Sequence, residues 1–209
     1  MKRIVVSTVT AAILALACRA NAYDRPWFDL RTTAPSRAFE LTVGTGYTQP
    51  FGLLESGVGM PAVATPGQGI EMGLGYRANA RWSVAVIGQF AELTAERSAT
   101  ARSLTPGIAA TYHLQPAMKL DPWVELASGY RLLWENDVRR THGILTHGLE
   151  VARLRLGLDY HEGAMAVGPL VGAGANLFLW QDTDASRTIA SPRVSVFVFA
   201  GVQGRWDVY

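Results

Sequence analysis

Eleven charged residues recur at alternate positions within otherwise apolar stretches, where they could form ion pairs or relay protons. Five acids stand against six arginines: Glu40, Glu71, Glu125, Asp159 and Asp207, with Arg77, Arg81, Arg131, Arg153, Arg155 and Arg205. Such numbers can pair almost completely, and an unpaired buried charge is costly. The pattern favours a structural ion-pair network, with a proton or ion relay as the alternative.

A second group of potentially reactive residues lies in polar segments: His142, His147, Asp182, Asp184, Ser186 and Ser191. A serine beside a histidine can act as a nucleophile activated by a base. These residues have no recognisable spacing, and ordinary loop composition explains them. We therefore predict no catalytic residue, no metal site and no cofactor.

A third group consists of large apolar residues that share the alternation phase of the charged residues. Its members are Ile87, Leu133, Phe178, Trp180, Phe197 and Phe199. Together they would form an apolar chamber above the charged network. Two interpretations remain open: the side chains pack against one another and close the chamber, or they line a site for a small hydrophobic molecule.

Eight alternating runs must position these groups. They cover about residues 38–47, 69–77, 81–90, 104–114, 124–134, 153–160, 164–179 and 194–208. Strict alternation of apolar and small or polar residues indicates β-strands. Runs of about ten residues are long enough for a tilted strand to cross a bilayer.

The connections alternate between long and short. Long polar segments lie near 49–66, 94–103, 135–146 and 181–191, and short ones lie near 77–80, 115–121 and 161–163. Short periplasmic turns and long outer loops are typical of outer-membrane barrels. The sequence therefore predicts an all-β fold, an eight-stranded antiparallel up-and-down transmembrane β-barrel.

The composition of the two faces indicates which one meets lipid. The apolar phase contains no Asp, Glu, Lys or Arg, whereas Gly, Ala, Ser and Thr dominate the other phase. Aromatic residues on the apolar phase gather at the short-turn end of the strands: Phe39, Tyr76, Trp82, Tyr112, Tyr160 and Trp206. Such a girdle marks a membrane interface. The apolar face should point to lipid, and the charged residues should point into the lumen.

Over residues 37–209 this architecture resembles the small outer-membrane barrels of the OmpA, OmpX and OmpW kind. The resemblance implies a bacterial outer-membrane location and, from the OmpW kind, a hydrophobic ligand in the apolar chamber. It also admits a rival class, the lipid A acyltransferases and deacylases. One feature departs from the pattern, because the terminal Tyr209 falls in the lumen phase.

The first 22 residues are typical of a secretory signal peptide. Lys2 and Arg3 precede an apolar stretch, and Ala20-Asn21-Ala22 fits the cleavage pattern. Cys18 offers a competing lipoprotein interpretation. We predict a signal peptide over 1–22, a periplasmic lead-in over 23–36 and a barrel over 37–209.

The charge balance excludes nucleic acid as a partner. Without Lys2, Arg3 and Arg19, 16 basic residues stand against 17 acidic ones, and nucleic-acid binding would need a basic surface. The expected partners are outer-membrane lipids and, through arginines in or beside the outer loops, lipopolysaccharide phosphates. These arginines are Arg97, Arg102, Arg139, Arg140, Arg187 and Arg193.

Overall fold

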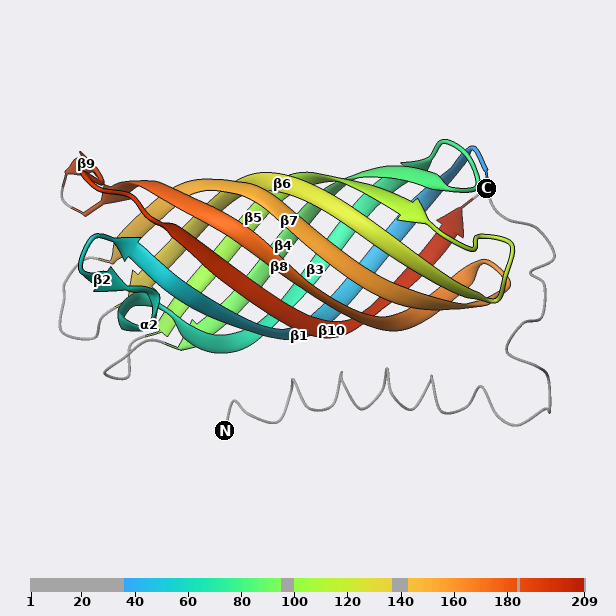
Figure 1. The fold of residues 1–209 in the computed structure, drawn as a ribbon, viewed down its shortest axis with the longest axis horizontal. Coiled ribbons are helices and arrows are strands. Elements are labelled where there is room, and N and C mark those ends of the chain that lie inside the picture. Colours follow the sequence, from blue (N-terminus) through green and yellow to red (C-terminus); the bar gives the residue numbers. More distant parts are fainter. Residues whose placement is uncertain (1–35, 95–99, 137–142, 184, 209) are drawn as a thin grey trace.

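A computed structural model describes residues 36–94, 100–136, 143–183 and 185–208 as one closed β-barrel (Figure 1). Its wall consists of β1 (Ala38–Glu55), β3 (Thr65–Arg77), β4 (Trp82–Thr94), β5 (Thr100–His113), β6 (Leu120–Asn136), β7 (Ile144–Glu162), β8 (Met165–Asp182) and β10 (Val194–Val208). Three short elements, β2 (Val58–Gly59), α2 (Met60–Val63) and β9 (Ser186–Thr188), lie at one end, opposite the C-terminus.

The wall strands follow the chain around the barrel, and every neighbouring pair is antiparallel. The barrel closes where β10 pairs with both β8 and β1, for example at Phe39 opposite Val208. The predicted fold class and strand count are confirmed. Among the described residues, no helix is long and apolar enough to cross a membrane.

The tight turns at the end of the barrel that holds the C-terminus are explained by their local sequence. Between β3 and β4, the Asn79 carboxamide oxygen accepts hydrogen bonds from the backbone N–H groups of Arg81 and Trp82. Between β7 and β8, Gly163 has φ of 62°, a conformation that glycine adopts without a Cβ clash. Short turns at this end agree with the predicted periplasmic side.

The strands are longer than the sequence predicted. They contain 13 to 19 residues, as in β3 and β7. In particular, the predicted loop over 49–66 is wrong: β1 continues to Glu55, and β2 and α2 follow it. The extra length lies toward the outer end, where the alternation becomes irregular.

The apolar residues face outward, as predicted. Leu74, Val86 and Ile108 expose 62%, 67% and 67% of their surface. The ring centroids of Trp82 and Tyr112 lie 4.9 Å apart, and Phe39 and Tyr76 form a second pair at 5.7 Å. An apolar surface of this extent is unfavourable in water, so it identifies the lipid-facing belt.

Leu156 offers a direct test of this belt, because it lies in the middle of β7 and its side chain points outward. Leu156→Arg should lower the free energy of unfolding by about 2–4 kcal/mol, the cost of an arginine at the bilayer midplane. Urea titration in lipid vesicles measures the change. Leu114→Arg, beside a turn, is the matched control and should cost at most about 1 kcal/mol. Equal losses at both positions would contradict a lipid-facing belt.

Several predicted features lie outside the described residues. They are the signal peptide over 1–22, the lead-in over 23–35, the loop residues Arg97, Arg139, Arg140, His142 and Asp184, and the terminal Tyr209.

Candidate functional site

A central ion-pair network crosses the lumen between β3, β6 and β7. Arg153 Nη1 lies 2.8 Å from Glu71 Oε2, and Arg155 Nη1 lies 2.6 Å from Glu71 Oε1. Arg155 Nε also donates to Glu125 at 2.7 Å. All four side chains are buried. These residues point into the lumen, and their charges are paired.

Glu150 completes the central network, and sequence reasoning missed it. Arg131 Nη2 donates to Glu150 Oε1 at 2.7 Å. The β7–β8 register shifts between Glu150 and Ala152, the β6–β7 register shifts at the same level between Ala127 and Gly129, and both Val151 and Ala152 are exposed. Glu150 and Arg153 therefore both point inward although three positions separate them. With Glu150 included, three carboxylates balance three guanidiniums.

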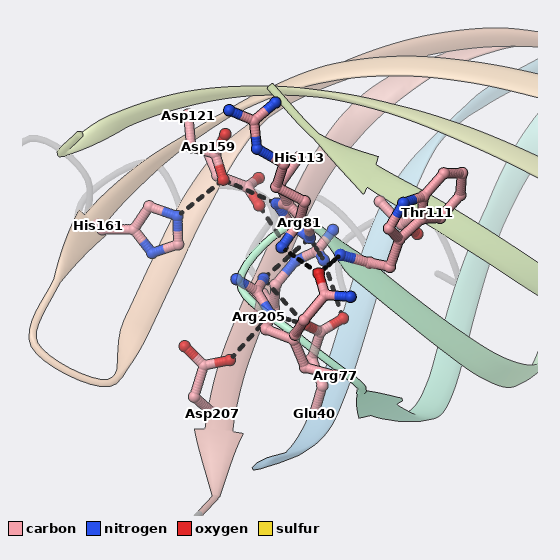
Figure 2. A network of polar contacts seen from close by, with 12 residues as sticks. Glu40, Arg77, Arg81, Thr111, His113, Asp121, Asp159, His161, Arg205 and Asp207 are labelled. Carbon is pink, nitrogen blue, oxygen red and sulfur yellow. Dashed lines mark hydrogen bonds and ion pairs between the residues drawn. The ribbon is translucent and has the colours of Figure 1, made fainter. Parts of the chain in front are cut away.

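A second network fills the lumen near the turn end of the barrel (Figure 2). Arg205 Nη1 donates to Glu40 Oε1 at 2.8 Å, and Arg77 Nη2 donates to Glu40 Oε2 at 3.1 Å. Arg205 Nε lies 3.1 Å from Asp159, and Arg77 Nε lies 4.0 Å from Asp207. Two arginines and three carboxylates thus form one connected group.

His113 and Asp121 extend this second network in a way that the sequence did not reveal. The Nε2 atom of His113 lies 2.9 Å from Arg77 Nη2 and 3.1 Å from Arg205 Nη1. Because guanidinium groups only donate, Nε2 must accept, and Nδ1–H then donates to Asp121 at 2.7 Å. His113 is therefore a neutral bridge that links the arginines to Asp121.

His161 also joins the turn-end network, with its Nε2 atom 3.8 Å from Asp121 Oδ2. Its side chain is buried at the end of β7. His113 already stood in the predicted lumen phase, but only acids and arginines were counted as charges. Asp121 and His161 stood in predicted turns, so nothing in the alternation marked them.

The assignment of Arg81 to the lumen is wrong. Arg81 lies in the turn before β4 begins at Trp82, and its side chain is exposed. Its guanidinium donates to the Tyr112 hydroxyl at 2.7 Å and lies over that ring. Arg81 therefore belongs to the interfacial girdle.

The upper lumen is filled by an apolar plug. Leu133, Phe178 and Phe197 are buried there and pack with residues from the outer-end segments. These partners are Leu54, Met60, Val63, Ala64, Leu93 and Ile189. Beneath them, the guanidinium of Arg131 lies 4.1 Å from the centroid of the Phe197 ring. The rings are therefore packed between α2 and the central network.

The other predicted chamber residues lie elsewhere. Ile87 packs with Ala109 and Ala127, and Phe199 packs with Trp123 and Leu170. The structure therefore divides five of the six predicted chamber residues among three clusters along the lumen. A cavity of about 40 Å³ lies beside Glu71, Gln89, Arg155 and Phe199, which is room for about three water molecules.

The predicted inward direction of Trp180 is wrong. In β8, Leu179 is an extra residue, because His147 pairs with Trp180 whereas Gly148 pairs with Phe178. The shift reverses the face. Gln181 therefore reaches the buried Thr146, and Trp180 stacks on the half-buried His147 with centroids 5.6 Å apart.

Of the residues considered for catalysis, His147 and Ser186 each hydrogen-bond to Asp182 and not directly to each other in the described part of the chain. His147 contacts Tyr130 through Nδ1 and Asp182 through Nε2, 3.1 Å from Oδ2. No contact joins His147 to Ser186 or Ser191 in the described chain. Within the same ranges, no group of three His, Cys, Asp or Glu side chains could hold a metal ion.

No protein-family model matches the chain, and no curated protein matches it. Among solved structures, it is similar to Neisserial surface protein A (NspA) at 13% identity, with a TM-score of 0.55, over 80% of this chain and 96% of that chain. It is also similar to the outer membrane protein OprG from Pseudomonas aeruginosa at 12% identity, with a TM-score of 0.51, over 82% and 96%.

At these identities the likeness concerns the fold, and it agrees with the belt, the girdle and the closed strand order. The chain therefore has the fold of the small eight-stranded β-barrels of the bacterial outer membrane, with its apolar belt as the lipid-facing surface.

Proposed function

We propose that this protein is a non-enzymatic, structural barrel of the bacterial outer membrane, exported through a signal peptide over residues 1–22. The observation that carries the proposal is the packing of the lumen at three successive levels. The turn-end network, the central network and the apolar plug all consist of buried side chains. A lumen filled in this way supports a scaffold in preference to a pore.

A planar-bilayer recording tests the closed lumen. We expect no steady ionic current above background, because paired charges and packed rings occupy the path. A control variant, Arg77→Ala with Glu71→Ala and Phe178→Ala, removes one group from each of the three levels and should conduct if it remains inserted. A steady single-channel current from the unaltered protein would overturn the proposal.

A second candidate function is the binding of a small hydrophobic molecule in place of the plug. The plug residues Met60 and Val63 belong to α2, which is part of a connection and not of the barrel wall. A ligand could take their place while the wall stays intact. Titration with a fluorescent apolar probe in detergent separates the two candidates, because saturable binding that Phe197→Arg abolishes would favour the ligand site.

The rival class, lipid A acyltransferases and deacylases, makes a different prediction. Such an enzyme would change the acyl pattern of lipid A in cells that produce it. We expect identical lipid A mass spectra with and without the protein, since the described His147 lacks a serine partner. A shift by the mass of one acyl chain would establish an enzyme.

A further inference from the structure

The height of the lipid-facing belt differs around the barrel. With a rise of about 3.3 Å per residue and a tilt of about 40°, each residue adds about 2.5 Å along the barrel axis. On β4, the belt runs from Trp82 to Phe90, about 20 Å by this rise, and Glu92 then faces outward. On the neighbouring β5, Arg102 ends the belt at a similar level and lies 3.8 Å from Glu92.

The belt continues much further on β1 and β10, which pair with each other. On β1, the outward apolar side chains run from Phe39 to Leu53, about 35 Å by the same rise. On β10, they run from Trp206 to Val194, about 30 Å. A typical barrel belt is about 25 Å tall. We call the outer surface of the paired strands β1 and β10 the seam. Its apolar side chains therefore extend further toward the outer end than those of an ordinary belt.

We call the upper part of the seam the seam strip: Tyr47, Phe51, Leu53, Val194 and Val196. Phe51 lies directly opposite Val196 in the register. Phe51, Leu53 and Val194 are 49%, 42% and 60% exposed. Gln49 is the polar residue between Tyr47 and Phe51 on this face of β1. Its side-chain oxygen accepts a hydrogen bond from the Tyr47 hydroxyl at 3.0 Å, so this oxygen has a partner other than water. The strip is thus a continuous apolar surface joined to the lipid-facing belt below it.

Arg193 stands at the upper edge of the seam strip. Its backbone N–H donates to the Leu54 carbonyl at 3.2 Å, which holds it beside β1, and its side chain is exposed. The other described arginines at this end are engaged, Arg102 with Glu92 and Arg187 with Glu55 and Gln181. Arg193 has no carboxylate partner in the described part of the chain.

We propose that the seam strip and Arg193 together bind one anionic lipid of the outer leaflet. Its acyl chains lie along the strip, and its phosphate sits on the Arg193 guanidinium. Continuity with the belt identifies the occupant as lipid, and a guanidinium above an apolar surface that no carboxylate of the described residues engages matches an acylated phosphate. This site goes beyond the closed barrel proposed above and does not depend on whether the lumen conducts.

Spin labelling tests the site on the full chain with Cys18→Ser, because Cys18 is the single cysteine. Nitroxides are placed at Leu53→Cys and, as a matched control on the short side, at Thr94→Cys, which is exposed near the outer end of β4 and leaves the Glu92–Arg102 pair intact. Collision rates with oxygen and with a water-soluble nickel chelate are compared in phosphatidylcholine vesicles and in phosphatidylcholine vesicles that contain lipid A. Oxygen is enriched among the acyl chains, whereas the nickel chelate stays in the water.

With lipid A present, the ratio of oxygen to nickel collisions at position 53 should rise several-fold, and the ratio at position 94 should stay constant. Arg193→Gln should abolish the rise, whereas Arg102→Gln should leave it intact. A ratio at position 53 that is unchanged by lipid A, or unaffected by Arg193→Gln, would overturn the proposal. Dipolar broadening between labels at position 53 would also overturn it, by showing a second copy of the chain on the strip.

Discussion

Replacing Arg153 by methionine should lower the free energy of unfolding by about 3–5 kcal/mol, the usual cost of breaking a buried ion pair by removing one partner. Arg153 is fully buried and lies 2.8 Å from Glu71, 3.8 Å from Glu125 and 3.8 Å from Glu150. Methionine retains much of the volume but none of the charge. Three carboxylates would then share two guanidiniums away from water.

Urea unfolding in detergent micelles, followed by tryptophan fluorescence, measures the Arg153→Met effect. Arg102→Met is the matched control, because Arg102 forms one exposed ion pair at 3.8 Å. Such a pair contributes at most about 1 kcal/mol. Equal unfolding curves for Arg153→Met and the unaltered protein would show that water reaches the central network and screens its charges.

Phe178→Ala should destabilise the barrel by a similar amount, about 3–5 kcal/mol, because a buried ring is lost and the surrounding plug collapses only partly. Phe178 is fully buried between wall residues and α2. The variant should also bind a small apolar probe that the unaltered protein excludes, since apolar cavities remain dry and accept such molecules.

Val198→Ala is the control for Phe178→Ala, because Val198 is 41% exposed on the lipid face of β10. Its unfolding free energy should change by less than about 1 kcal/mol. Probe binding is measured by fluorescence titration at equal protein concentrations. A stable Phe178→Ala variant that binds no probe would show that the plug is loosely packed in the unaltered protein.

The wall of the barrel could be predicted because alternation repeats over many residues. Each outward leucine, valine or aromatic residue on β3, β4 and β5 keeps the same phase, and no charge interrupts it between the girdle and Phe90 on β4 or Leu104 on β5. The inward direction of Glu71, Glu125, Arg153 and Arg155 follows from the same phase. Which carboxylate pairs with which arginine could not be predicted, because this depends on which strands face each other across the lumen.

The errors in the predicted site have local causes. Val151 and Ala152 are both apolar and are both compatible with a lipid-facing position. No residue type therefore reveals the register shift that turns Glu150 inward. The same holds for Leu179, which turns Trp180 outward. A one-residue shift reverses every later side chain. The plug was missed for another reason: Met60 and Val63 lie in a segment with glycines and prolines, which is typical of an open loop.

The Arg205–Glu40 pair also constrains how the barrel assembles. Glu40 lies on the first strand and Arg205 on the last, 165 residues later. This contact therefore exists only after β10 has met β1, at the final step of ring closure. Before that step, Glu40 can pair only with Arg77 and Arg205 only with Asp159. Ring closure therefore joins two smaller ion-pair groups into one network, and the long chain separation between Glu40 and Arg205 makes this contact slow to form.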